Sequence, residues 1–341
     1  MKGRQIVLDH INGFEAAALV VDGRLEDLLI DSDAPRVGAI YRAVADRPVK
    51  GQGGMFLSTP DGQVFLRQVR GISPGQSMLV QVSGHAEPGK AMPVTQKLLF
   101  KSRFAIVTPD APGLNISRSI RDDDLRDRLL EIAHDSMDGD GDMGLILRSS
   151  CADAEADEIA ADIAEMVQLA QAVLADSTGP AEKLTDGDGP HVMAWREWVE
   201  PAEVVTDAGG FAQLGVLDMI AALAQPKVAL PGGGSMFVEP TRALVAVDVN
   251  TGTDTSPAAA LKANIAAARD LPRQLRLRGL AGQITLDAAP MPKKDRRSFE
   301  MALRAAFRAD PVETVLAGWT PLGHYELQRK RERRPLAELI K

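Results

Sequence analysis

Two aspartates follow apolar, strand-like runs in the last third of the sequence. Asp248 ends the run "LVAVD" and Asp287 ends the run "QITLD". Alternate side chains of a strand share a face, so Asn250 is expected on the same face as Asp248. The helical segment between the two runs is long enough to return the chain to the same end of a sheet. If the strands are neighbours, we expect the two carboxylates to meet at one edge.

Paired carboxylates of this kind point to metal chemistry. Two anions repel unless a cation lies between them, and Asn250 adds a neutral oxygen beside Asp248 and Asp287. Such hard oxygen donors suit Mg²⁺ or Mn²⁺ and not zinc. The bound metal would orient and polarise a phosphodiester and help to generate the attacking hydroxide. The alternative is that these aspartates cap the helix or turn that follows each strand.

The helical segment and the C-terminal tail are rich in arginine. Arg269, Arg273 and Arg276 recur at helical spacing, which predicts one cationic stripe behind the metal site. The tail "ELQRKRERRPL" adds Arg329 and Arg331. We expect these five side chains to contact phosphates of a nucleic acid. Pro272 inside the segment predicts a kink or a late helix start.

The charge of the chain is unevenly distributed. The net charge is −8 over 341 residues, but residues 262–341 hold 17 Lys and Arg against 9 Asp and Glu, and the rest holds 22 against 38. A basic quarter on an acidic body is expected when one part of a protein meets phosphates. A solvated basic surface is the alternative.

The remaining composition limits the class of protein. The single cysteine, Cys151, excludes an internal disulfide and a multi-cysteine metal site, and it fits a reducing, cytoplasmic location. The N-terminal residues read as strands and not as a signal peptide, and no apolar run is long enough to span a membrane. The five histidines show no ligand spacing.

Strand and turn signals organise the chain. Residues 4–31 predict a hairpin around Asp22–Gly23, and the short strands of residues 36–103 predict an OB-type barrel. Phe56 and Phe65 flank a turn of that barrel, where they stack bases or belong to its core. Further along, the patterns predict helices over 122–134, 211–224, 257–278 and 295–309, and an acidic helix that ends at Ala175. A linker is expected over 176–190.

The order of these parts resembles the catalytic half of the ribonuclease E/G family. The strongest likeness lies in "PGGGSMFVEPTRALVAVDVNTG" and "NIAAARDLPRQLRLRGLAGQITLDAAPM", and "GHYELQRKRERRPL" resembles the family's closing segment. The resemblance implies an α+β multidomain fold with an OB-type β-barrel insert, a sensor subdomain, a reduced RNase H-like part and a DNase I-like α/β nuclease domain. The implied boundaries are 1–35 and 191–224 for the split RNase H-like part, 36–103 for the barrel, 104–190 for the sensor and linker, and 225–341 for the nuclease domain.

The resemblance also implies an activity and a site. The family cleaves single-stranded RNA endonucleolytically with Mg²⁺, so Asp248 and Asp287 correspond to its metal ligands. Asn250 corresponds to the residue that orients the scissile phosphate or Asp248. Arg148 and Ser149 fall where the family presents an Arg and a hydroxyl residue to a 5′-monophosphate.

In the barrel, the resemblance implies RNA contacts by three side chains. Phe56 and Phe65 correspond to ring positions of the RNA-binding insert. Lys90 corresponds to a basic residue of that insert, or is a solvated turn lysine.

Several departures from the family pattern bear on the function. The chain lacks the Cys-x-x-Cys zinc link, so a zinc-linked tetramer is not expected, whereas a homodimer stays open. The family has basic residues after the position of Asn250, but here the segment "TGTDTS" is polar and contains Asp254. Pro290 stands where the family has an acidic residue. Fewer cations beside the metal would lower transition-state stabilisation. The alternatives are therefore an RNA-binding protein with impaired catalysis and a metal-dependent phosphodiesterase for small nucleotides.

Overall fold

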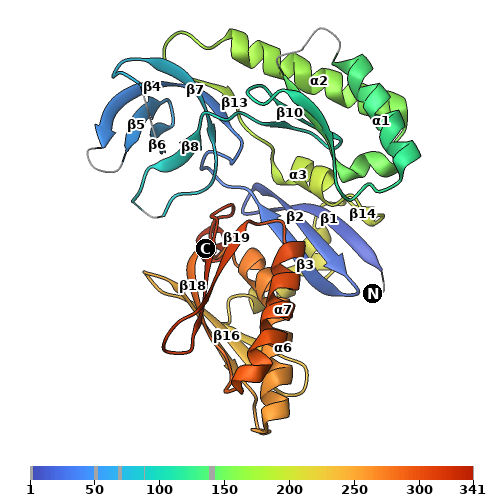
Figure 1. The fold of residues 1–341 in the computed structure, drawn as a ribbon, viewed down its shortest axis with the longest axis vertical. Coiled ribbons are helices and arrows are strands. Elements are labelled where there is room, and N and C mark those ends of the chain that lie inside the picture. Colours follow the sequence, from blue (N-terminus) through green and yellow to red (C-terminus); the bar gives the residue numbers. More distant parts are fainter. Residues whose placement is uncertain (1–2, 50–52, 68–70, 88, 138–142, 341) are drawn as a thin grey trace. The chain divides into compact units, whose positions relative to one another are not determined.

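The chain folds into two compact units of mixed α and β structure. The computed structural model describes residues 3–49, 53–67, 71–87, 89–137 and 143–340. The first unit combines Met1–Asp31 with Ala202–Lys341, and the second unit is Ser32–Pro201 (Figure 1). The α+β class is therefore as predicted, and the first unit is built from both ends of the chain.

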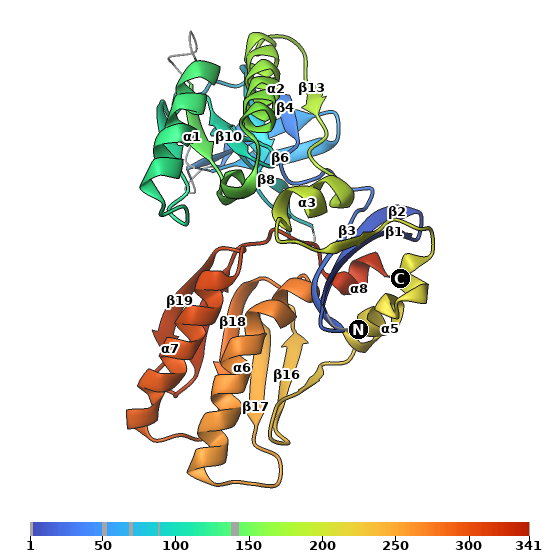
Figure 2. The same cartoon turned by 90° about the vertical axis from the view of Figure 1, so that its right-hand side faces the viewer.

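The larger sheet of the first unit has six strands, in the order β15-β16-β17-β18-β20-β19. The strands are β15 (Lys227–Ala229), β16 (Ser235–Pro240), β17 (Val245–Asn250), β18 (Gly282–Asp287), β19 (Thr314–Trp319) and β20 (Tyr325–Arg329). The β17–β18 pair is parallel and the other pairs are antiparallel. Figure 2 shows helices α6 (Pro257–Leu277) and α7 (Lys293–Ala309) on one side of this sheet.

The period of two in β17 explains why only one face of this sheet carries helices. Val245, Val247 and Val249 are buried in a core shared with α6 and α7, whereas Asp248 and Asn250 are exposed. Small residues of α6, such as Ala267 and Ala268, are fully buried and let the helix lie close to the strands. The opposite face of the sheet is left to solvent-facing side chains.

Helix α6 differs from the sequence expectation at Pro272. The helix already starts at Pro257 and continues through Pro272, so the late start considered from the sequence is wrong, and a kink at Pro272 stays a prediction. Proline removes one backbone donor and usually disrupts a helix. Here Leu271, Pro272 and Leu275 are buried, and the packing of this face outweighs the loss of one hydrogen bond.

The second sheet of the first unit has the order β14-β1-β2-β3. It contains β1 (Arg4–Ile11), β2 (Phe14–Val21), β3 (Arg24–Ile30) and β14 (Glu203–Val205). The hairpin predicted at Asp22–Gly23 is confirmed between β2 and β3, and a second hairpin turns at Asn12–Gly13. Asn12 and Asp22 have φ of 52° and 49°, the left-handed backbone that two-residue hairpin turns need. Short helices pack on this sheet: α4 (Gly210–Gln213), α5 (Val216–Ala222) and α8 (Leu336–Leu339).

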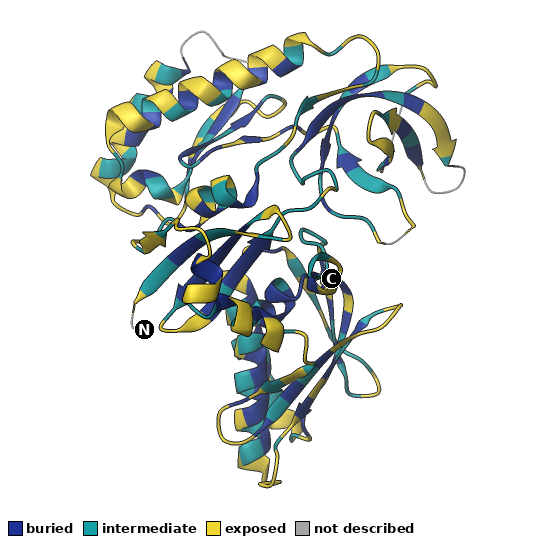
Figure 3. Cartoon of the chain, turned by 180° about the vertical axis from the view of Figure 1, so that it is seen from behind, coloured by how far each residue is buried: buried dark blue, intermediate teal, exposed yellow. Residues whose placement is uncertain are grey.

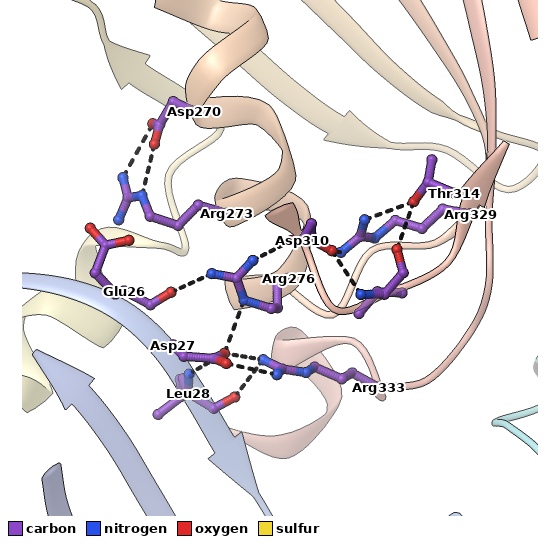
Figure 4. A network of polar contacts seen from close by, with 11 residues as sticks. Glu26, Asp27, Leu28, Asp270, Arg273, Arg276, Asp310, Thr314, Arg329 and Arg333 are labelled. Atoms are coloured by element: carbon purple, nitrogen blue, oxygen red, sulfur yellow. Dashed lines mark hydrogen bonds and ion pairs between the residues drawn. The ribbon is translucent and has the colours of Figure 1, made fainter. Parts of the chain in front are cut away.

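A buried network of arginines and aspartates ties the N-terminal strands to α6 and to the C-terminal segment (Figure 4). Arg329 Nη2 lies 2.8 Å from Asp310 Oδ1, and both side chains are 1% exposed. Arg276 also pairs with Asp310 and donates to the carbonyl of Glu26. Arg333 pairs with Asp27 of β3 through both Nη atoms. Three of the 17 basic residues of residues 262–341 are thus paired with aspartates inside the fold.

The second unit contains the predicted barrel. Strands β4 (Ile40–Val49), β5 (Gly54–Thr59), β6 (Gly62–Leu66), β8 (Met92–Thr95) and β7 (Ser77–Val82) pair in this order, and β7 pairs back with β4. The result is a closed five-stranded barrel, as expected of an OB-type insert. Strand β13 (Glu182–Thr185) joins β4, so part of the expected linker over 176–190 is a strand.

The rest of the second unit is a small sheet with helices against it. Its strands are β9 (Phe100–Lys101), β10 (Ala105–Thr108), β11 (Gly113–Ile116) and β12 (Gly144–Leu147), in the order β11-β12-β10-β9. The predicted helices are found as α1 (Asp123–Ser136) and α2 (Ala156–Ala175), followed by α3 (Pro190–Glu197). Along α2, buried residues recur every three or four positions, as expected of a helix with one face in the core (Figure 3).

Within the described ranges, no helix combines the length and the apolar character needed to cross a bilayer.

The network makes a prediction for Asp27. Burial raises the pKa of Asp27, but Arg333 and Arg276 outweigh burial and hold the pKa below its usual range. A carboxyl group with a lowered pKa stabilises the fold above the pKa of the unfolded chain, about 3.9, and this contribution is lost as the pH falls through the folded pKa. We expect Asp27→Asn to cost about 3 kcal/mol of unfolding free energy at pH 7, because the largely enclosed guanidinium groups of Arg333 and Arg276 lose a carboxylate partner.

Urea unfolding between pH 2 and pH 7 measures this effect. The wild-type protein should lose stability as the pH falls below about 4, and the loss should be smaller in Asp27→Asn. Glu338→Gln, at an exposed i,i+4 pair with Arg334, is the matched control and should change stability by less than about 0.5 kcal/mol. An Asp27→Asn variant with wild-type stability at both ends of the range would contradict the assignment.

Candidate active site and nucleic-acid interface

The two aspartates predicted to converge are direct neighbours across the β17–β18 pair. Asp248 lies opposite Asp287 in the parallel register, and both are exposed. Opposite residues on adjacent strands project from the same face with their Cβ atoms about 5 Å apart. Helix α6 supplies the return path, because it starts after β17 and delivers the chain to the start of β18. The expected meeting of the carboxylates at one sheet edge is confirmed.

Asn250 orients one of these carboxylates. Its Nδ2 donates to Asp248 Oδ2 at 2.7 Å, and the residue is exposed on the face that carries Asp248. The hydrogen bond restrains the orientation of the Asp248 carboxylate. The helix-cap alternative finds no support at Asp248, because Ser256 caps α6 through Ala259. Pro292 precedes α7 with no side-chain cap, so Asp287 does not cap that helix either.

His324 is a site residue that the sequence reasoning missed. Its Nε2 lies 3.9 Å from Asp287 Oδ1, and its side chain is 37% exposed. The β18–β20 register pairs Leu286 with Tyr325, so His324 stands next to Asp287 at the same edge. The turn from Thr320 holds it there, with the Thr320 N–H donating to the His324 carbonyl at 2.7 Å. Reading "YELQR" as a strand instead of part of a basic tail would have been the signal.

The donor set fits a hard divalent cation. Asp248 and Asp287 provide carboxylate oxygens, and in the described part of the chain no lysine or arginine pairs with either of them. The same residues contain no group of three or more His, Cys, Asp or Glu able to hold a metal. A cation here would therefore take two protein carboxylates and complete its shell with water or phosphate oxygens, as Mg²⁺ usually does.

The expected cationic track on α6 and the tail needs correction. Arg273 bonds Asp270 and the Leu25 carbonyl and is 15% exposed, and Arg276 bonds Asp310 and is 12% exposed. Arg329 is 1% exposed. Internal carboxylates hold these three guanidinium groups. Their contacts also link α6 or β20 to a neighbouring segment, so the groups are not available to bind phosphates. Arg269 is exposed, as expected, and Arg331 is partly exposed with its guanidinium against Gly282.

The barrel carries an aromatic pair on its outer face. Phe56 lies opposite Phe65 across the β5–β6 hairpin, with ring centroids 5.4 Å apart. Both rings are partly exposed and lie outside the barrel core, which contains their neighbours on the other face. The guanidinium of Arg47 lies 5.6 Å from the Phe56 ring centroid. Two rings with an adjacent cation form a surface on which nucleobases can stack.

Lys90 is a solvated turn residue. Its Nζ lies 2.5 Å from Glu87 Oε2 and its side chain is 68% exposed. Its backbone N–H closes the same turn on the Glu87 carbonyl. This placement favours the turn reading, and an RNA contact by Lys90 stays a prediction.

The predicted phosphate sensor is engaged with groups of its own unit. Arg148 Nη2 lies 2.6 Å from Glu197 Oε2, and Arg148 Nη1 donates to the Ser102 carbonyl at 2.6 Å. Burial raises the pKa of Glu197, but Arg148 and Arg196 outweigh it and keep the pKa below its usual range. Ser149 is exposed beside Arg148. A ligand phosphate at Arg148 would replace the Glu197 carboxylate.

The described parts therefore define an α+β protein that combines an OB-type barrel with a separate sheet carrying paired carboxylates. The Ribonuclease E/G family profile matches residues 100–200 and 196–332. The chain is 27% identical to "Ribonuclease E" of Synechocystis sp. over 99% of its own length and 58% of that relative. It is 27% identical to "Ribonuclease E" of Nostoc sp. over 96% of its length and 56% of that relative. It is 26% identical to "Ribonuclease G" of Salmonella typhimurium, over 98% and 81% respectively.

The chain belongs to the ribonuclease E/G family. It spans little more than half the length of the Synechocystis and Nostoc relatives.

The carboxylate pair makes a prediction that needs no RNA. Mg²⁺ should raise the melting temperature, by the equivalent of about 1.4 kcal/mol at ten times its Kd. Asp248→Asn and Asp287→Asn should each abolish this response and leave the metal-free protein at least as stable, because one of two repelling anions is removed. Differential scanning calorimetry with and without Mg²⁺ measures both effects. Asp295→Asn, on α7, is the control and should respond to Mg²⁺ as the wild type does; an undiminished response in both site variants would refute the metal assignment.

Proposed function

We propose that this chain is a Mg²⁺-dependent endoribonuclease that cleaves single-stranded RNA. The observation that carries the proposal is the in-register neighbour pair of Asp248 and Asp287 on an open sheet face. Membership of the ribonuclease E/G family and relatives named as ribonucleases support the RNA substrate. A bound Mg²⁺ would polarise the phosphodiester and lower the pKa of the attacking water.

The residues of the chain have separable roles in this proposal. The carboxylates of Asp248 and Asp287 would hold the cation, with Mn²⁺ as a substitute for Mg²⁺. Asn250 would keep Asp248 in its ligating rotamer through the 2.7 Å hydrogen bond. The imidazole of His324, whose Nε2 lies 3.9 Å from Asp287 Oδ1, would contact a substrate oxygen bound beside Asp287. Arg269, which is exposed, and Arg331, which is partly exposed, would contribute phosphate contacts.

The second unit would hold the RNA strand. Phe56 and Phe65 offer a stacking surface, and Arg47 adds a cation beside it. Arg148 and Ser149 would bind a 5′-monophosphate once Glu197 releases the guanidinium. This makes 5′-end sensing by the chain conditional on breaking an internal ion pair.

A second candidate is an RNA-binding protein with little or no turnover. Arg273, Arg276 and Arg329 are committed to internal pairs, so fewer cations are left to stabilise a transition state near the carboxylates. Asp254 adds a further anion in the loop after Asn250. A phosphodiesterase for small nucleotides is the third candidate, and unlike the first two it predicts no steep salt dependence of binding to long RNA.

The first test replaces both aspartates. Asp248→Asn combined with Asp287→Asn should reduce cleavage of a labelled single-stranded RNA by at least about a thousandfold, because the cation would lose its protein ligands. RNA binding should stay within about threefold of the wild type. Gel assays of product and fluorescence polarisation of binding measure the two effects. Equal cleavage by the double variant refutes the site, and binding without any cleavage by the wild type favours the second candidate.

The second test concerns the barrel. Phe56→Leu and Phe65→Leu should each weaken RNA binding by about 1–3 kcal/mol, because leucine keeps the apolar contact and loses the ring face. Leu169→Ala, an exposed position on α2, is the control and should leave affinity unchanged. Titration of fluorescein-labelled RNA gives the affinities, and thermal melting checks that the variants fold. Unchanged affinity in both phenylalanine variants would assign the rings to packing alone.

A further inference from the structure

A phenylalanine stands beside the carboxylate pair on the open face of the large sheet. Phe237 of β16 lies opposite Asp248 of β17, and Asp248 in turn lies opposite Asp287. The neighbours of Phe237 in its own strand, Met236 and Val238, are 0% and 1% exposed in the core under α6 and α7. Phe237 itself is partly exposed on the other face. The ring is therefore not needed to fill that core.

A lysine completes this position. Lys227 of β15 lies opposite Phe237, and its Nζ is 6.0 Å from the ring centroid. Lys227 is exposed, and no ion pair joins it to a carboxylate within the described ranges. The four side chains Lys227, Phe237, Asp248 and Asp287 thus form one lateral row across four adjacent strands.

The charge of the next row limits where RNA can lie. Two residues further back on the same face, Glu239, Ala246, Thr285 and Glu326 form a parallel row. The two glutamates repel phosphates that would run down the sheet along the strands. In the row that contains Lys227, the positions on β15 and β16 are Lys227 and Phe237, and neither repels a phosphate. A strand of RNA is therefore directed across the strands, from the carboxylates towards Phe237 and Lys227.

We propose that Phe237 and Lys227 form a binding subsite for the nucleotide next to the scissile phosphodiester. The nucleobase stacks on the Phe237 ring, and the Lys227 ammonium swings from the ring to the phosphate of the same nucleotide. Adjacent strands are about 4.8 Å apart, so the ring lies one strand spacing from Asp248. Stacking accepts any base, because every base offers a π face. The subsite sets the position of the cut along the strand and not its sequence. The inference rests on the proposed function, because it takes RNA to the Asp248 edge.

The experiment combines a protein change with an RNA change. The probe is a single-stranded RNA of about ten nucleotides in which one abasic residue is placed at each position in turn. Affinities are measured by fluorescence polarisation with Ca²⁺ in place of Mg²⁺, for the wild type, Phe237→Leu and Phe237→Trp. In the wild type, abasic positions within the bound stretch should weaken binding. At one of these positions, the nucleotide that contacts Phe237, the abasic residue should weaken RNA binding by the wild type about tenfold. The same abasic residue should not weaken binding by Phe237→Leu, because that variant has no ring for the base to stack on.

Phe237→Leu on intact RNA should itself weaken binding about tenfold, and Phe237→Trp should bind at least as well as the wild type. Lys227→Gln should reduce the salt dependence of binding by about one phosphate contact. Met301→Ala, exposed on α7 on the other side of the sheet, is the control and should alter none of these values. Thermal melting establishes that each variant is folded. Should Phe237→Leu fold poorly, Phe237→Trp tests the stacking in the opposite direction, because a larger ring should keep or increase the abasic loss at the same nucleotide.

Cleavage in Mg²⁺ separates this inference from the proposed function. An abasic effect that depends on Phe237, found without any cleavage, supports the subsite and contradicts the endonuclease. Cleavage with abasic effects that are the same in the wild type and in Phe237→Leu overturns the subsite and leaves the endonuclease standing. The absence of RNA binding overturns both.

Discussion

The parallel pairing of β17 with β18 is the constraint on which the candidate site depends. It sets Asp248 opposite Asp287, and helix α6 makes it attainable by carrying the chain back to the start of β18. A shift of one residue in this register would turn Asp287 into the core under α6 and α7 and bring Leu286 to the surface. Burial of Leu286 and Ile284 therefore fixes the position of a polar group that itself contributes little to stability. The fold stabilises the arrangement, and in the proposed function a divalent cation would relieve the repulsion between the carboxylates.

The arginines of the chain divide into two groups that composition alone does not separate. Within the first unit, Asp310 pairs with Arg276 and Arg329, and Asp27 pairs with Arg333. These ion pairs connect strands and helices of that unit. A buried ion pair costs desolvation and repays it only with good geometry and further hydrogen bonds. The donation from Arg276 to the Glu26 carbonyl and from Arg329 to Thr314 meets that need. These basic residues of the C-terminal quarter thus stabilise the fold, and only the basic side chains that stay exposed can bind phosphates.

Sequence reasoning was most successful where a periodic pattern met a buried face. The alternation in β17, the run of β18 that ends in Asp287 and the turn at Asp22–Gly23 are local signals, and each appears in the structure as predicted. It failed where tertiary partners decide. Pro272 stays helical because its neighbours are buried, and β13 pairs with β4 within an apparent linker. His324 gained its place beside Asp287 from a strand pairing that a run of basic residues concealed. No local pattern could separate a stripe of arginines facing solvent from one facing Asp310.

The central claim is that Asp248 and Asp287 share one divalent cation, and crystals soaked in Mn²⁺ test it most directly. The anomalous difference map should show a peak between the two strand ends, about 2.2 Å from a carboxylate oxygen of each aspartate, with water in the remaining positions. The peak should vanish in crystals of Asp287→Asn. A Mn²⁺ peak bound elsewhere, with none between these two side chains, would contradict the account.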